Sequence, residues 1–142
     1  MFTVTRRIEI DAGHRIPDHA SKCFNLHGHR YVIEATLQSE QLVGVGEERG
    51  MVMDFGFLKA AMMKVIHDEY DHRFILYHKD PEIDQFRALP GLVIIPLVPT
   101  AENLAHIWLQ GLQAYLPPRV HLQKVEVWET PNCVASFFNP HH

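Results

Sequence analysis

The chain has 142 residues, 46% of them hydrophobic, which suffices for one compact domain and is short for two. A formal net charge of −4 leaves no basic surplus to hold a nucleic acid or an anionic membrane by bulk electrostatics. Two cysteines are too few for the disulfide framework of a small secreted protein. We therefore expect a single domain over residues 1–142 with no nucleic-acid or membrane partner. Any anion that it binds must be held by side chains at the binding site rather than by the net charge.

The N-terminal segment MFTVTRRIEIDAGH lacks the apolar core of a signal peptide. No apolar run approaches the length of a membrane span. With the cysteines interpreted as cytosolic thiols, these features predict a cytoplasmic protein.

Two strands are predicted at the start of the chain. Apolar and polar residues alternate over residues 2–10 and again over residues 27–39, which is the period of a half-buried strand. The apolar face of the second strand also carries two histidines. Its members are His27, His29, Tyr31, Ile33, Ala35 and Leu37.

Two helices are predicted from caps and apolar spacing. Asp54 can cap a helix that ends near Tyr70, and Thr100 can cap one that ends at Pro117. Residues 73–77 and 92–98 can form short extended runs on either side of an irregular segment. Residues 121–130 and 133–138 close the chain as two strands.

This order predicts an α+β fold in which both helices cover one face of an antiparallel sheet. Such a sheet has exposed edges, and a small domain can cover them by pairing with copies of itself.

Three histidines converge in this arrangement. Strand alternation puts His27 and His29 on one face, roughly 7 Å apart along the chain. The even-numbered face of the first strand ends at His14, which antiparallel pairing would place opposite them. Three neutral imidazoles with an open fourth position are typical of a catalytic zinc site. The alternative is a set of hydrogen-bonded histidines at a sheet margin.

Cys23 admits three interpretations. It can be a small buried hydrophobe, a thiolate favoured by the charge of Lys22, or a fourth ligand that closes the metal site. Asp71-His72 at a helix end and Glu129 near a strand end are also common as ordinary surface residues. Glu102 could simply favour the dipole of its helix.

Together these residues resemble the 6-pyruvoyltetrahydropterin synthase family, most closely the spacing of its bacterial branch that forms 6-carboxy-5,6,7,8-tetrahydropterin. The motifs span nearly the whole chain. They are His14, Cys-x₃-His-Gly-His over residues 23–29, MDFGFLK at 53–59, Asp71-His72, PTAEN at 99–103 and WET at 128–130. One departure is the segment 76–98, which is longer than in compact bacterial members and could alter the site rim or the assembly.

The resemblance implies the tunnelling fold, in which a four-stranded antiparallel sheet carries two helices on one face. Sheets would join edge to edge into a barrel, and two trimers would stack as a homohexamer with sites between subunits. It also implies residue roles. These are Zn²⁺ ligation by His14, His27 and His29, catalysis by Cys23, Asp71 and His72, and substrate binding by Glu129 and Glu102.

The implied reaction converts 7,8-dihydroneopterin triphosphate to 6-carboxy-5,6,7,8-tetrahydropterin in queuosine (7-deazaguanine) biosynthesis, with loss of triphosphate and acetaldehyde. The four-residue step from Cys23 to His27 favours this product. The alternatives are 6-pyruvoyltetrahydropterin synthesis or a related side-chain cleavage, and a metal- or pterin-binding module without turnover. Arg15, Lys22 and Arg30 lie close enough in sequence to donate to the triphosphate, with none assigned.

Overall fold

The computed structural model describes residues 1–19 and 25–141. Within them the strands are β1 (Phe2–His14), β2 (His27–Ser39), β3 (Arg73–Tyr77), β4 (Leu92–Ile95), β5 (His121–Thr130) and β6 (Cys133–Phe138). The helices are α1 (Phe55–Met62), which continues through a π-helical turn, η2 (Met63–His67), into α2 (Asp68–Tyr70), then α3 (Ile83–Phe86) and α4 (Ala101–Tyr115).

The strands form one sheet in the order β4-β3-β1-β2-β5-β6. β1, β2, β5 and β6 pair antiparallel, as predicted, whereas β3 pairs parallel with both β1 and β4. The four expected antiparallel strands are therefore present, but the prediction of a four-stranded sheet is wrong, because β3 and β4 extend it to six strands. The long helical segment returns the chain so that β3 enters beside β1 in the same direction, and the connection through α3 does the same for β4. Pro96 lies just past β4, which is an edge strand, and a proline suits an edge because it has no N–H to donate to a further strand.

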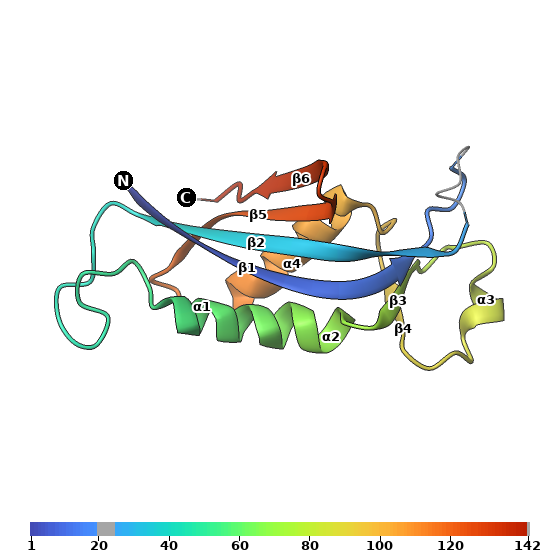
Figure 1. Ribbon diagram of the computed structural model, residues 1–142, viewed down its shortest axis with the longest axis horizontal. Helices are drawn as coiled ribbons and strands as arrows, with labels where there is room; N and C mark the ends of the chain where they lie inside the picture. The colour runs from blue at the N-terminus through green and yellow to red at the C-terminus, as the bar shows by residue number, and fades with distance from the viewer. Residues whose placement is uncertain (20–24, 142) are drawn as a thin grey trace.

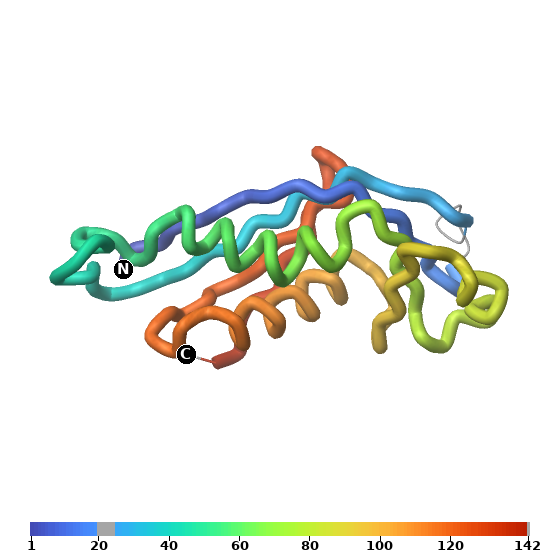
Figure 2. Tube along the Cα trace, turned by 90° about the horizontal axis from the view of Figure 1, so that it is seen from below, coloured from blue at the N-terminus to red at the C-terminus, as the bar shows by residue number. Residues whose placement is uncertain are grey.

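Both long helices lie against the same face of the sheet (Figures 1 and 2). Each begins at its predicted cap. The Asp54 carboxylate accepts from the N–H groups of Gly56 and Phe57, and the Thr100 hydroxyl accepts from the N–H of Asn103. In the described part of the chain, none of the helices is long and apolar enough to cross a membrane.

The core lies between these helices and the inner face of the sheet, which is the face the helices cover. Side chains of β1, β2 and β5 meet those of α1, η2 and α4 there, and Trp108 is only 1% exposed. The fully buried members include Tyr31, Ile33, Leu37, Leu58, Met62, Ile66, Leu104, Leu112 and Leu122. The opposite, outer face carries charged side chains such as Glu9, Asp11 and Arg30. Position parity along a strand therefore decides whether a side chain meets the core or the outer face.

The first long helix contains a π turn in its middle. The N–H of Asp68 donates to the carbonyl of Met63, five residues back, where a regular α-helix would bond four residues back. The helix then resumes, and Tyr70 packs its ring edge-on against Trp108 with centroids 5.3 Å apart. The turn thus sets the direction in which the helix ends, immediately before Asp71 and His72.

A buried ion pair ties the segment after β3 to the end of β1. Arg15 is 3% exposed, and its Nη1 lies 3.4 Å from Oδ1 of Asp80, which is 2% exposed. The same nitrogen donates to Oε2 of Glu82 at 3.1 Å. Because Arg15 follows a predicted metal ligand directly, this pair anchors the excursion between β3 and β4 beside the histidine cluster.

Replacing Asp80 by alanine should lower the free energy of unfolding by about 3 kcal/mol, because it removes the buried carboxylate that faces the buried guanidinium. Urea unfolding at equal protein concentration measures this change. The matched control is Asp84→Ala, which removes an exposed pair with Arg87 and should cost less than about 1 kcal/mol. Equal effects of the two substitutions would contradict the structural role of the buried pair.

Candidate metal centre and active site

The register of β1 against β2 brings three histidines together. His14 pairs directly with His27, and Ala12 with His29, as the predicted antiparallel pairing requires. All three side chains continue the inner face of the sheet. One ring nitrogen from each lies within 4.8 Å of the others.

The ring tautomers of two histidines follow from their neighbours. Nδ1 of His14 lies 2.7 Å from the carbonyl oxygen of Pro99, and Nδ1 of His27 lies 2.7 Å from that of Asn25. A carbonyl oxygen only accepts, so both Nδ1 atoms carry the proton. The two Nε2 atoms then hold lone pairs, and they face each other at 3.0 Å.

This arrangement fits a bound cation. Two facing lone pairs repel each other, and a positive charge between them removes the repulsion. In a tetrahedral site with bonds of about 2.0–2.1 Å, ligand nitrogens lie about 3.3 Å apart, close to the observed spacing. Carbonyl acceptors behind ligating imidazoles are the usual means of fixing tautomer and ring orientation.

Burial favours the neutral form of His14 and His29, as metal ligation requires. It lowers the pKa of His14 to about 4, and the charges of His27 and His29 act in the same direction. Burial also lowers the pKa of His29, against an opposing effect of Glu129. At neutral pH His14 and His29 are therefore available as neutral nitrogen ligands.

Tyr31 is a member of the site that sequence reasoning did not single out. Its hydroxyl lies 3.0 Å from Nδ1 of His14, and burial raises its pKa above the ordinary range, so it stays protonated. It follows His29 by two residues on the same strand face, so parity could have pointed to it. The Pro99 carbonyl could not be found in this way, because it reaches His14 from 85 residues along the chain.

Glu129 and Glu102 share a pocket next to the histidines. Both line a depression of about 290 Å³ at the start of α4 and the turn between β5 and β6, together with Cys133. Glu129 is near enough to His29 and Tyr31 to influence both electrostatically. The structure thus brings the two predicted substrate-binding carboxylates together, near His29 of the histidine cluster.

Asp71 and His72 form a hydrogen-bonded pair, hereafter the dyad. Nδ1 of His72 lies 2.8 Å from Oδ2 of Asp71, while Oδ1 of Asp71 accepts from the backbone N–H of Asp11 at 2.9 Å. His72 has a φ of 58°, a left-handed conformation that is uncommon outside glycine. Its N–H donates to the carbonyl of Asp11 at 2.6 Å, which helps to hold that conformation.

The charges of the dyad follow from these contacts. Burial acts against the charged form of Asp71, but the hydrogen bonds from Asp11 and His72 outweigh it and the pKa of Asp71 is lowered. The hydrogen bond to Asp71, and then its charge, raise the pKa of His72. Since Nδ1 faces a carboxylate, Nε2 is the ring nitrogen that can exchange a proton with another molecule.

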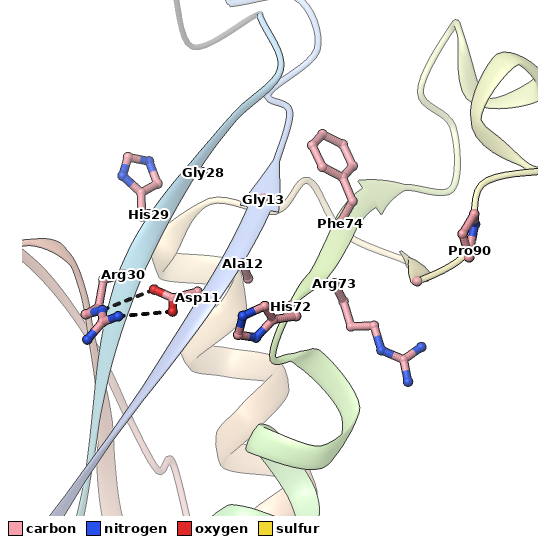
Figure 3. Close-up of a pocket in the computed structure, with 11 residues that line it drawn as sticks. Asp11, Ala12, Gly13, Gly28, His29, Arg30, His72, Arg73, Phe74 and Pro90 are labelled. Atoms are coloured by element: carbon pink, nitrogen blue, oxygen red, sulfur yellow. Dashed lines mark hydrogen bonds and ion pairs between the residues drawn. The ribbon is translucent and has the colours of Figure 1, made fainter.

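Within one chain, most of the histidine cluster lies away from the dyad. His72 lines a pocket of about 510 Å³ with Asp11, Gly13, Gly28 and Arg30, whose strand positions face the outer side of the sheet, and His29 of the histidine cluster also lines it (Figure 3). His14, His27 and His29 lie at the alternate strand positions, whose side chains face the inner side of the sheet. Within one chain the dyad and the imidazoles of His14 and His27 therefore form two half-sites on opposite faces of the sheet.

Four further residues singled out in the sequence remain to be placed. Cys23 and Lys22 lie outside the described residues. Arg30 is on the outer face, paired with Asp11. Arg15, in contrast, is buried against Asp80 and Glu82.

Comparison with known proteins finds relatives of one family that match almost the whole chain. The family described as 6-pyruvoyl tetrahydropterin synthase matches residues 3–140. The 6-carboxy-5,6,7,8-tetrahydropterin synthase of Rickettsia bellii is 40% identical over 141 residues, covering 94% of this chain and 97% of that protein. The protein of the same name from Haemophilus influenzae is 29% identical over 142 residues and covers 96% and 99%.

Solved structures show the same fold. An uncharacterized protein from Wolinella succinogenes superposes with a TM-score of 0.83 at 24% identity, covering 97% of this chain and 98% of that one, which supports the fold alone. The 6-pyruvoyl tetrahydropterin synthase of Caenorhabditis elegans superposes with a TM-score of 0.69 at 29% identity, covering 97% and 95%.

Proposed function

The chain belongs to the 6-pyruvoyl tetrahydropterin synthase family, and from that premise we propose that it is a zinc-dependent lyase that converts 7,8-dihydroneopterin triphosphate to 6-carboxy-5,6,7,8-tetrahydropterin. Triphosphate and acetaldehyde are the other products. Relatives named for this carboxylated product, at 29–40% identity, support the choice within the family. The reaction would serve queuosine biosynthesis in the cytoplasm.

The observation that carries the proposal is the pair of facing Nε2 atoms on His14 and His27, 3.0 Å apart with both Nδ1 atoms committed to carbonyl oxygens. Together with His29 they make a three-imidazole set, which suits a catalytic Zn²⁺ ion with an open position. When bound, Zn²⁺ supplies Lewis-acid chemistry at the side-chain hydroxyls of the substrate.

The protein's own residues then bind the substrate and move protons. The Glu129 carboxylate accepts hydrogen bonds from ring N–H and amino groups of the pterin, with Glu102 in the same pocket. Cys23, as thiolate, takes a proton from the substrate side chain. Asp71 holds His72 in the tautomer that exposes Nε2, so this imidazole can remove or return a proton.

Product analysis tests the function. Purified protein loaded with Zn²⁺ is incubated with 7,8-dihydroneopterin triphosphate, and the pterin, triphosphate and acetaldehyde are measured. Stoichiometric acetaldehyde with a carboxylated pterin is expected. A pyruvoyl side chain without acetaldehyde would favour the second candidate, for which the likeness to the Caenorhabditis elegans enzyme speaks. Binding without any turnover would overturn the enzymatic proposal and leave a pterin-binding module.

Assembly is part of the same proposal. We infer a homohexamer of two stacked trimers, joined through sheet edges into a barrel. Its support is the separation of the two half-sites within one chain, together with edge strands β4 and β6 that end the sheet without a further partner among the described residues. In such an assembly the dyad of one subunit can face the metal cluster of its neighbour.

Replacing Glu129 by glutamine should weaken pterin binding by roughly 10–100-fold, the size expected when hydrogen bonds lose a charged acceptor. Metal content should stay unchanged. Titration calorimetry with a pterin ligand and metal analysis measure the two effects. The control is Glu126→Gln on the same strand, where the carboxylate pairs with Lys124 and Ser136 on the outer face. Unchanged affinity in the Glu129 variant would remove this residue from the pterin pocket.

A further inference from the structure

Asp11 contacts both residues of the dyad and the guanidinium of Arg30. Its backbone N–H donates to Oδ1 of Asp71 at 2.9 Å, and its carbonyl accepts from the N–H of His72 at 2.6 Å. Its carboxylate forms a two-pronged pair with Arg30, with Nε to Oδ1 at 3.1 Å and Nη2 to Oδ2 at 3.2 Å (Figure 3). One residue of β1 therefore links the dyad to a charge on β2.

The carboxylate and the guanidinium act on the imidazole with opposite signs. The charge of Asp11 raises the pKa of His72, and the charge of Arg30 lowers it, both more weakly than the direct contact with Asp71. Arg30 also lies 3.7 Å from Glu9, so its charge is shared. Among the described residues, the charged or titratable groups that face the dyad include Asp11 from β1, His29 and Arg30 from β2, His67 from η2 and Arg73 from β3.

We propose that the Asp11–Arg30 pair is a positioning and tuning element for the dyad. The backbone of Asp11 holds Asp71 and His72 in place, and the balance between its carboxylate and Arg30 sets how readily His72 takes up a proton. This inference rests on the proposed function only for the acid–base role of His72. The Asp11–Arg30 contact itself is independent of the metal.

Two substitutions should move the protonation of His72 in opposite directions. Arg30→Gln leaves the Asp11 carboxylate unpaired, which stabilises the imidazolium and raises the midpoint of its titration. Asp11→Asn keeps the backbone hydrogen bonds but leaves the Arg30 charge less compensated, which lowers the midpoint. A unit charge ~7 Å away in water changes a pKa by about 0.4, so shifts of roughly 0.3–0.5 pH unit are expected, smaller for Asp11→Asn because Glu9 remains beside Arg30.

The experiment is an NMR titration of the His72 ring in the full chain, with the resonance assigned by its loss in His72→Gln. It compares the wild type, both single variants, the double variant and the control Arg7→Gln, which removes an outer-face charge paired with Glu34. We expect opposite shifts in the single variants, near cancellation in the double variant and no shift in the control. Shifts of the same sign, or none, would overturn the inference, because a purely structural role predicts no such opposition.

The pH dependence of turnover separates this inference from the proposed function. If His72 acts in catalysis, one limb of the rate profile should follow its NMR midpoint through the variant series. If the NMR midpoints shift with the expected signs but the rate profile does not follow them, Asp11 and Arg30 still tune His72, and His72 takes no part in the rate-limiting proton transfer. Unchanged NMR midpoints would refute the tuning even in a fully active enzyme.

Discussion

Replacing His29 by alanine should abolish stoichiometric metal binding and, with it, turnover. Two imidazoles remain, and a three-ligand site that loses one nitrogen loses most of its affinity. The fold should persist, since His29 is only partly buried at the margin of the core. Metal analysis after gel filtration and thermal unfolding followed by circular dichroism measure the two outcomes.

The matched control is His78→Ala, which removes an exposed histidine whose ring packs edge-on against Tyr77. It should retain one equivalent of metal per chain. Full metal content in the His29 variant would refute the assignment of His29 as a metal ligand. Retention of weakened binding that disappears only when Cys23 is also replaced would show that the thiol is a ligand, contrary to the proposed proton-transfer role.

Mixing two inactive variants should restore activity if the site is shared between subunits. Cys23→Ala removes the proposed thiol, and His72→Ala removes the dyad imidazole. When equal amounts are unfolded together and reassembled, each group reaches a given site with a probability of about one half. About a quarter of the sites should then hold both, and the mixture should regain about a quarter of wild-type activity.

The geometry of the chain is the reason for this expectation, since His72 lies on the outer side of the sheet, whereas the imidazoles of His14 and His27 gather on the inner side. If both groups came from the same chain, no intact site could form in the mixture. Mixed oligomers verified by mass spectrometry that remain as inactive as their parents would refute the shared site. The double variant Cys23→Ala/His72→Ala, mixed with wild type, is the dilution control.

Short-range patterns predicted most of what places the histidines. Alternation assigned His27 and His29 to the apolar face of β2, and antiparallel pairing put His14 opposite them, as the register shows. The helix caps at Asp54 and Thr100 were also identified correctly. Each of these features depends on residues that are neighbours in the chain or across one strand pair.

Features that depend on contacts between distant segments could not be predicted from the sequence. The β3 and β4 segments were recognised as extended, but their parallel direction depends on how the long helix and α3 return the chain. Likewise, the motif Asp71-His72 does not indicate that its imidazole faces the outer side of the sheet. That orientation depends on hydrogen bonds to Asp11, 60 residues earlier. Nothing local encodes such a contact.

The π turn between Met63 and His67 has a consequence for chain length. Successive residues of an α-helix point about 100° apart, so removing one residue ahead of Asp71 would rotate everything after it by that amount. The wider turn accommodates its extra residue with the bond from Asp68 to Met63. A one-residue deletion in this turn could restore regular helical bonding and leave Asp71 nearly in place, whereas a deletion in the regular part of α1 would swing Asp71 away from the N–H of Asp11. Homologues that keep the dyad in this position should therefore either keep the residue count between Asp54 and Asp71 or lack one residue together with the wide turn.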